Sequence, residues 1–240
     1  GGAMNLTSYL SSQYKRNIQI ISDLSKNTNF ISIVRFLKGG NYMELKYLLD
    51  MTTKKYPFDY KIASNNIIDK DCKVVVTNYD SGRASYLSVK EFGWNKTMEA
   101  TGSIPIATKG YCQIAGKKYL DGGLVDPLPV KRVYDWGYKN ILLVRTHQIN
   151  IKPDWKIESL YGPLFYRDNP KLQALIIKND KIYKRQQKFI ENSPYDLNIM
   201  QIAPEKELKC GIISSTPESI QLDYLNGIEK GMDFLNLINY

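Results

Sequence analysis

One acid in the sequence stands where a catalytic side chain is expected. Residues 111–114 and 117–120 are short β-favouring runs separated by an Ala-Gly pair, which predicts a tight hairpin. The second run leads directly into Asp121, Gly122 and Gly123. Consecutive glycines form sharp turns and allow close backbone approach, so we expect Asp121 to end a strand, to point into a cleft and to cap no helix. The alternative is a turn acid hydrogen-bonded to its own backbone.

Asp126 has a different expected role. It precedes Pro127, and an acid before a proline is typical of a helix N-cap followed by the first helical position. We therefore expect Asp126 to cap a helix at 127–136. Paired carboxylates are also used in glycoside hydrolysis and metal binding, but no further acid or histidine partner accompanies Asp121 and Asp126.

Few other groups offer nucleophilic chemistry. His147 is the only histidine, and no motif supports a Ser-His-Asp triad built on it, so we interpret it as a structural or surface residue. Ser81 and Ser103 lie beside glycines, yet neither shows the Gly-x-Ser-x-Gly pattern of a nucleophile elbow. Three more serines lie in a predicted helix at 3–14: Ser8, Ser11 and Ser12. The sequence thus offers a base without a nucleophile.

Cysteine spacing and glycine patterns exclude several classes of site. Cys72, Cys112 and Cys210 are far apart, and with a single histidine they do not form a zinc-binding pattern. No phosphate-binding loop is present. We expect no metal or organic cofactor, and free thiols favour a reducing compartment such as the cytoplasm.

The net charge of +9 predicts attraction to anionic partners. No zinc-finger spacing, RNP-like aromatic motif or arginine-rich stretch accompanies it, so we expect no nucleic acid. Peripheral contact with an anionic membrane is one interpretation of this charge, and a solvated basic surface without function is the other. Lysines on one side of the amphipathic helix predicted at 168–192 leave the same two alternatives.

The elements that position Asp121 alternate between strands and helices. Residues 72–77 and 140–145 are continuous apolar runs, typical of strands buried on both faces of a parallel sheet. Further strands are expected at 83–87 and 196–202, and helices at 41–50, 90–101 and from Thr216 to about 235. We predict a single α/β domain over residues 1–240, with a doubly wound, mainly parallel sheet between two helical layers and the site at the carboxyl ends of the strands.

The segment 103–130, SIPIATKGYCQIAGKKYLDGGLVDPLPV, resembles the second signature of the patatin-like lipid acyl hydrolases. In that family a small-residue-plus-proline segment leads to a strand ending in Asp-Gly-Gly, whose aspartate is the catalytic acid/base and corresponds to Asp121. The opening GAMNLTSYLSSQYKRN resembles the helix after the family's Gly-x-Ser-x-Gly elbow. Gly1 and Gly2 would then be the last two elbow positions, with the serine just before Gly1.

This resemblance implies a patatin-like fold and hydrolysis of lipid esters by a Ser–Asp dyad. The serine attacks the acyl carbonyl and Asp121 takes its proton, which requires burial to raise the basicity of the carboxylate. Because the family's nucleophile and oxyanion loop precede this segment, we expect the 240 residues to be an inactive fragment located in the cytoplasm or at a membrane periphery. One alternative is a cloning remnant at 1–3 before a start at Met4, and another is a catalytically inactive relative that binds lipids or anionic membranes.

Overall fold

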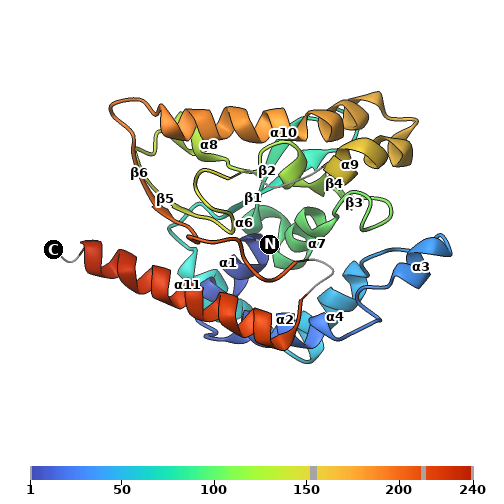
Figure 1. Ribbon diagram of the computed structural model, residues 1–240, viewed down its shortest axis with the longest axis horizontal. Helices are drawn as coiled ribbons and strands as arrows, with labels where there is room; N and C mark the ends of the chain where they lie inside the picture. Colours follow the sequence, from blue (N-terminus) through green and yellow to red (C-terminus); the bar gives the residue numbers. More distant parts are fainter. Residues whose placement is uncertain (1, 152–155, 212–214, 239–240) are drawn as a thin grey trace. The chain divides into compact units, whose positions relative to one another are not determined.

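The computed structural model describes residues 2–151, 156–211 and 215–238 (Figure 1). The chain divides into two compact units, each built from two separate stretches. Unit 1 consists of Gly1–Pro127 and Lys156–Asn179, and unit 2 of Leu128–Trp155 and Asp180–Tyr240. Each unit has its own small sheet, and the chain is a mixed α/β structure.

Unit 1 contains a four-stranded sheet in the order β2-β1-β4-β3. Its strands are β1 (Lys73–Asn78), β2 (Ala84–Ser88), β3 (Cys112–Ile114) and β4 (Lys117–Asp121). Every neighbouring pair is antiparallel. The prediction of a mainly parallel, doubly wound sheet is therefore wrong for the described residues, where β5 and β6 of unit 2 form the one parallel pair.

The predicted hairpin before Asp121 is confirmed. Strands β3 and β4 pair from Cys112 with Tyr119 to Ile114 with Lys117. Ala115 and Gly116 both have positive φ, 48° and 74°, as a two-residue type I′ turn requires. The turn fixes the register of β4 and hence the place where Asp121 leaves the sheet.

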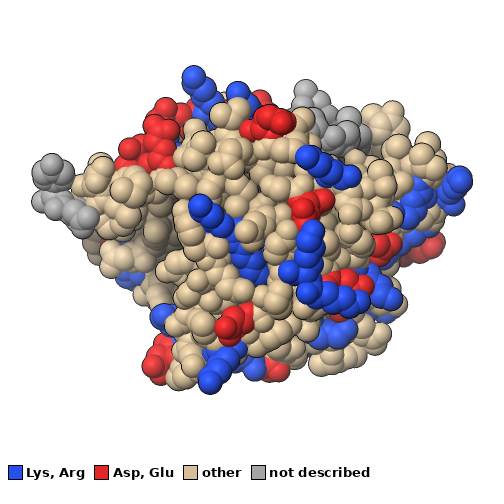
Figure 2. Space-filling view, turned by 90° about the horizontal axis from the view of Figure 1, so that it is seen from below, with Lys and Arg blue, Asp and Glu red and all other residues tan. Residues whose placement is uncertain are grey.

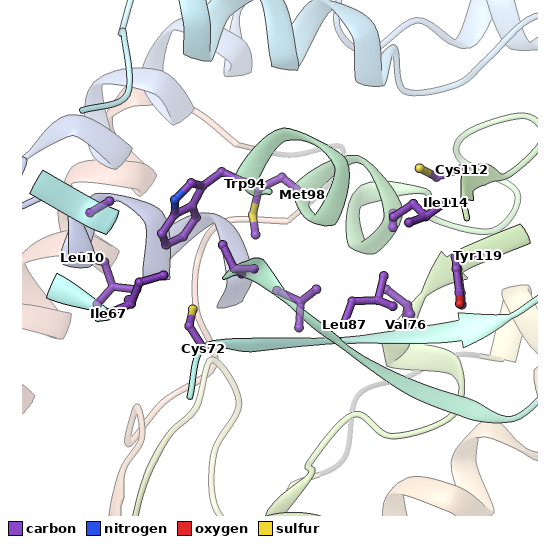
Figure 3. Close-up of a cluster of buried hydrophobic side chains, with 14 residues drawn as sticks. Leu10, Ile67, Cys72, Val76, Leu87, Trp94, Met98, Cys112, Ile114 and Tyr119 are labelled. Carbon is purple, nitrogen blue, oxygen red and sulfur yellow. The ribbon is translucent and has the colours of Figure 1, made fainter. Parts of the chain in front are cut away.

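Helices cover both faces of this sheet. One face packs in a large apolar cluster that includes Val76, Trp94 and Met98 (Figure 3), and the other packs Leu120 against Leu172 and further residues. The helical elements of unit 1 are α1 (Gly2–Leu10), α2 (Arg16–Ser25), α3 (Ile33–Leu37), α4 (Leu45–Lys54), α5 (Tyr60–Asn66), α6 (Val89–Phe92), α7 (Trp94–Gly102), the 3₁₀ turn η1 (Gly122–Leu124), α9 (Lys156–Tyr161), the 3₁₀ turn η2 (Gly162–Tyr166) and the first part of α10 (Pro170–Glu191). The run 72–77 is apolar because the sheet is covered on both sides, which an antiparallel sheet also allows.

Helix boundaries differ from the predictions where the backbone changes conformation. The helix expected at 3–14 ends at Leu10, and Lys15 adopts a left-handed conformation before α2 begins. The helix expected at 90–101 is divided by Gly93, whose φ is 76°. The helix expected at 41–50 begins only at Leu45.

Unit 2 is built on a pair of parallel strands, β5 (Asn140–Val144) and β6 (Asn198–Ile202). Its helices are α8 (Val130–Asp135), the second part of α10 and α11 (Pro217–Ile238). Apolar residues of α8, β5 and α10 form its core, including Val130, Ile141 and Tyr183.

Three sequence expectations for unit 2 are wrong in part. Strand β5 exposes Leu142 and Val144, so it is not buried on both faces. Helix α8 begins at Val130 instead of 127. Helix α11 begins where predicted, with the Thr216 hydroxyl accepting a hydrogen bond from the Ser219 N–H. The helical spacing of its apolar residues also predicts that one face lies inward, but four residues of that face are exposed: Leu225, Ile228, Met232 and Leu235.

Candidate functional site

The backbone of Asp121 is fixed from both sides where β4 ends. Asp121 lies opposite Val76 of β1, and its N–H donates to the carbonyl of Ser103 at 2.9 Å. Its own carbonyl accepts a hydrogen bond of 2.7 Å from the buried Thr77 hydroxyl. Side chains alternate along a strand, so Asp121 projects from the same face as Tyr119, which packs in the large apolar cluster of unit 1.

The two glycines after Asp121 have distinct roles. A Cβ on Gly122 would lie 2.4 Å from the Val75 carbonyl oxygen and 2.5 Å from its carbon, so a side chain there would collide with the backbone of β1. The N–H of Gly123 donates to Oδ1 of Asp121 at 2.6 Å. The predicted close backbone approach is thus found at Gly122, while Gly123 holds the carboxylate.

Asp121 therefore does cap a helical turn, contrary to the sequence interpretation. The turn is the three-residue η1, and the cap is the single bond from Gly123 to Oδ1. This is the local hydrogen bond that a purely structural turn acid would make. It involves one carboxylate oxygen and leaves Oδ2 without a hydrogen bond or ion pair to any described residue.

The surroundings make Asp121 more basic than an ordinary aspartate. Loss of hydration raises the pKa of its carboxyl above the usual value of 3.8, and the Gly123 N–H opposes this shift with a smaller effect. The residue is still partly exposed, so the acid is recessed but reachable. In the described part of the chain no Lys, Arg or His forms an ion pair with it. A carboxylate with raised pKa and one unengaged oxygen can accept a proton.

Asp126 is not the N-cap that the sequence predicts, because the chain continues without helix until Val130. Its carboxylate accepts a hydrogen bond from the Tyr86 hydroxyl on β2, and its N–H donates to the Gly122 carbonyl at 2.9 Å. Asp126 fixes the exit of the turn after Asp121 and remains structural, by a different contact.

The start of α1 lies close to the backbone that holds Asp121. The Met4 Cε atom is 3.8 Å from the point that a Cβ on Gly102 would occupy, and Gly102 precedes Ser103, the hydrogen-bond partner of Asp121. Gly2 is the first residue of α1, while Gly1 lies outside the described residues. The structure thus brings the two segments that carry the sequence resemblance into one unit and near one another.

The hydroxyls of most candidate serines donate hydrogen bonds elsewhere. Ser103 is buried and donates to the carbonyl of Glu99 at 2.8 Å. Ser81 donates to Asn78 Oδ1 in the turn between β1 and β2. Ser8 lies in α1 as expected, but Ser11 and Ser12 follow its end. Among the described residues, none of these serine hydroxyls is hydrogen-bonded to the carboxylate of Asp121, whose contact with Ser103 is between backbone groups.

His147 belongs to unit 2 and is exposed. Its Nδ1 lies 3.2 Å from the Thr146 hydroxyl. Partial loss of hydration and the charge of Arg145 lower its pKa, so the ring is neutral near pH 7. No carboxylate is hydrogen-bonded to this ring among the described residues, as a catalytic triad would require.

The cysteines are free. Cys72 and Cys112 are buried, and Cys210 is partly exposed. Burial raises the pKa of Cys112 to about 11, which keeps it protonated and unreactive at neutral pH. Within residues 2–151, 156–211 and 215–238, no cluster of His, Cys, Asp and Glu has the composition of a metal site.

Arg145, which follows β5, is a buried charged residue that no sequence motif indicates. This buried guanidinium donates to the Tyr183 hydroxyl at 2.8 Å and to Gln201 Oε1 at 3.1 Å. Its buried Nε atom has no hydrogen-bond partner in the part of the chain that the structure describes. An arginine directly after an apolar run is only a weak indication of burial. It would indicate burial only once the run is known to be a strand of a sheet.

Comparison with known proteins gives no functional class. A family described as a domain of unknown function (DUF6363) matches residues 169–239. The uncharacterized protein YjjU of Escherichia coli (strain K12) is 27% identical over 240 residues, which is 98% of this chain. The chain spans 66% of the length of that relative. No solved structure matches the chain.

On the face drawn in Figure 2, Lys and Arg side chains are interspersed with Asp and Glu on a mostly uncharged surface. None of the helices in the described part of the chain is long and apolar enough to cross a membrane.

Proposed function

We propose that the chain is part of a lipid acyl hydrolase, with a patatin-like fold in the whole protein, in which Asp121 is the acid/base of a Ser–Asp dyad. The observation that carries this proposal is the state of the Asp121 carboxyl. It is recessed, its pKa is raised by loss of hydration, and one of its oxygens is fixed while the other has no hydrogen-bond partner among the described residues. The capping bond from the Gly123 N–H lowers the pKa of the carboxyl, and the loss of hydration outweighs it.

The chemistry follows from this environment. A serine hydroxyl becomes a nucleophile when a neighbouring base takes its proton as it attacks the acyl carbonyl. A carboxylate with a raised pKa is a better proton acceptor than an ordinary one at neutral pH. The same group, once protonated, can return the proton to the leaving alcohol. No metal or organic cofactor enters this scheme.

The nucleophile is proposed to come from the segment that precedes α1 in the longer protein, with Gly1 and Gly2 as the end of its elbow. The contact of the Met4 side chain with Gly102, which precedes the backbone partner of Asp121, supports this, because it holds α1 against the segment that leads to Ser103. The cover of helices on both faces of the unit 1 sheet is compatible with a three-layer arrangement. As it stands the 240-residue chain would be inactive.

The proposed partners are a lipid substrate and an anionic membrane surface, with a location in the cytoplasm or at a membrane periphery. A second candidate function is lipid binding without hydrolysis. Exposed apolar side chains on α3 and η2 favour it, because they can contact lipid. Such binding requires no nucleophile.

The test uses the longer protein that includes the region upstream of Gly1. Hydrolysis of a p-nitrophenyl acyl ester is compared for the parent, Asp121→Asn and His147→Asn, with circular dichroism as a check of folding. Loss of the acid/base is expected to reduce kcat by about a thousandfold, while His147→Asn keeps the parent rate.

Each other outcome has a definite meaning. A rate that does not change in Asp121→Asn refutes the dyad, and a collapse in His147→Asn would instead indicate a histidine triad. No hydrolysis by the folded parent, on esters of short and long acyl chains, favours the lipid-binding alternative.

A further inference from the structure

Two neighbouring segments of unit 1 expose large apolar side chains. Helix α3 exposes three residues spaced i, i+1 and i+4, which share one side of the helix: Ile33 at 57%, Val34 at 57% and Leu37 at 77%. The turn η2 exposes Leu164 at 56% and Phe165 at 53%. We call these five residues the α3–η2 surface. Apolar side chains gathered at such exposure mark sites of interaction.

The two segments are joined by direct contact. The rings of Phe36 and Phe165 lie 6.0 Å apart, and Phe36 also packs edge-on against Tyr42. A Cβ on Gly162, the first residue of η2, would lie 2.8 Å from Ile106, so the turn rests on the chain that follows Ser103. The α3–η2 surface is therefore one continuous feature of unit 1.

The exposed face of α3 is held in place from behind. The Arg35 guanidinium donates to the backbone carbonyls of five residues: Thr28, Asn29, Phe30, Asn41 and Tyr42. The Ser32 hydroxyl caps the helix by accepting from the Arg35 N–H at 3.2 Å. A short helix that is fixed this firmly keeps its apolar face outward instead of collapsing onto the core.

Positive charge borders the apolar residues. Lys38 follows Leu37 directly and is exposed, and the exposed Lys109 reaches to 3.9 Å from the point that a Cβ on Gly39 would occupy. Neither lysine forms an ion pair with a described residue. The nearby Glu44 carboxylate accepts from the Asn41 side chain, and Asp168 follows η2 at the surface.

The surface also connects to the candidate site. The Met43 N–H donates to the Ala107 carbonyl at 2.8 Å, and the Lys109 N–H to Asn41 Oδ1 at 2.8 Å. Residues 104–109 thus bind the base of α3 at one end and lead to Ser103, the backbone partner of Asp121, at the other. A membrane bound here would therefore contact a segment that is continuous in sequence with Ser103, the backbone partner of Asp121.

We propose that the α3–η2 surface is the site at which the protein binds the interface of an anionic phospholipid membrane. Exposed Leu, Ile, Val and Phe side chains gain free energy on entering the acyl boundary, and neighbouring lysines are attracted to anionic head groups. Apolar residues with a cationic border match both parts of such an interface, whereas a nucleic acid would match the charges alone. The proposal does not depend on hydrolysis by Asp121.

The experiment is co-sedimentation of the 240-residue chain with phosphatidylcholine vesicles, with and without phosphatidylglycerol. Leu37→Ser and Phe165→Ser remove apolar contact, and Ile68→Ser is the matched control, because Ile68 is 62% exposed in unit 1 after the end of α5. Lys38→Glu changes the charge beside α3, and Lys61→Glu makes the same change in α5.

The chain is expected to bind only the vesicles that contain phosphatidylglycerol. Leu37→Ser and Phe165→Ser should each weaken this binding about tenfold, as expected for an apolar side chain that no longer enters the membrane. Lys38→Glu should weaken it more than Lys61→Glu, and added salt should weaken it for all variants.

Several results would overturn the proposal. These are equal binding to neutral vesicles, equal losses for Ile68→Ser and Leu37→Ser, or no vesicle binding together with self-association that Leu37→Ser abolishes in analytical ultracentrifugation. The last result would assign the surface to contact between two copies of the chain. Sedimentation needs no catalysis, so the two proposals can fail separately. Vesicle binding without ester hydrolysis by the longer protein would refute the proposed enzyme and retain this surface. Ester hydrolysis without vesicle binding would refute this surface and retain the proposed enzyme.

Discussion

The two units each place an ionisable side chain at the end of a strand, and the two residues are held in opposite ways. Asp121 is the last residue of β4 in unit 1, and Arg145 directly follows β5 in unit 2. Neither has an ion-pair partner of opposite charge among the described residues. Arg145 is buried and donates to two neutral side chains, whereas Asp121 is partly exposed and accepts one backbone N–H.

This difference matches the roles proposed for the two residues, Arg145 as a structural charge and Asp121 as an acid/base. The hydrogen bonds of Arg145 go to Tyr183 and Gln201, which fix α10 and β6 around the end of β5. Arg145 thus positions these two elements. Asp121 has one carboxylate oxygen without a hydrogen-bond partner among the described residues, and its pKa is raised. Both properties favour the proposed proton transfer.

The largest loss of stability is expected when Gly122, directly after Asp121, is substituted. Gly122→Ala forces a methyl group against the backbone of Val75, and this strand cannot move without disturbing the whole sheet. We expect a loss of about 3 kcal/mol or more in the free energy of unfolding, measured by urea denaturation followed by circular dichroism.

Gly123→Ala is the matched control for this variant. Its Cβ would lie 3.2 Å from Oδ1 of Asp121, and a side-chain atom can shift by a few tenths of an ångström. The expected loss is about 1 kcal/mol or less. Equal stability of Gly122→Ala and the parent would show that the η1 turn does not lie close enough to Val75 of β1 to exclude a side chain at Gly122.

Removal of the buried guanidinium should have the next largest effect. Arg145→Ala leaves the Tyr183 hydroxyl and Gln201 without their donor and opens a cavity in the core of unit 2. We expect a loss of about 2–4 kcal/mol in the free energy of unfolding. Arg185→Ala, which removes an exposed arginine from α10, should change stability by about 0.5 kcal/mol or less. Similar values for the two variants would contradict a structural role for Arg145.

Local patterns predicted the surroundings of Asp121 well. The Ala-Gly turn, the end of β4 at Asp121 and the close approach at Gly122 all follow from residue type and short spacing. The same holds for the 22-residue helix α10, whose apolar spacing is long enough to define one face. These features depend on contacts within a few residues or one helix turn.

Strand direction and burial could not be predicted from the same information. Strand β1 is apolar on both faces because helices cover both sides of an antiparallel sheet, and its residues alone do not distinguish this from a parallel sheet. Asp126 shows the same limit, since its partner Tyr86 is 40 residues away. Arg145 was missed because its partners lie on β6 and α10, and the exposed face of α3 because a short apolar run fits a core equally well.

The smallest of the three stability effects is expected from Asp121→Asn, and its sign depends on pH. The pKa of Asp121 is raised in the folded protein, so its contribution to stability is complete below the unfolded pKa near 3.8 and is lost as pH rises through the folded pKa. An asparagine can still accept the Gly123 N–H but does not ionise. Asp121→Asn should therefore match the parent at low pH and become more stable than the parent as pH rises to 7, by an amount on the order of 1 kcal/mol or less because the residue is partly exposed.

Asp196→Asn in unit 2 provides the opposite sign, since hydrogen bonds from Lys139 and Tyr134 lower the pKa of Asp196 and its stabilising effect is present above the unfolded pKa. Urea denaturation of the parent and both variants between pH 3 and pH 7 measures the two differences, and a stability difference for Asp121→Asn that falls with rising pH would show that the Gly123 hydrogen bond outweighs the loss of hydration.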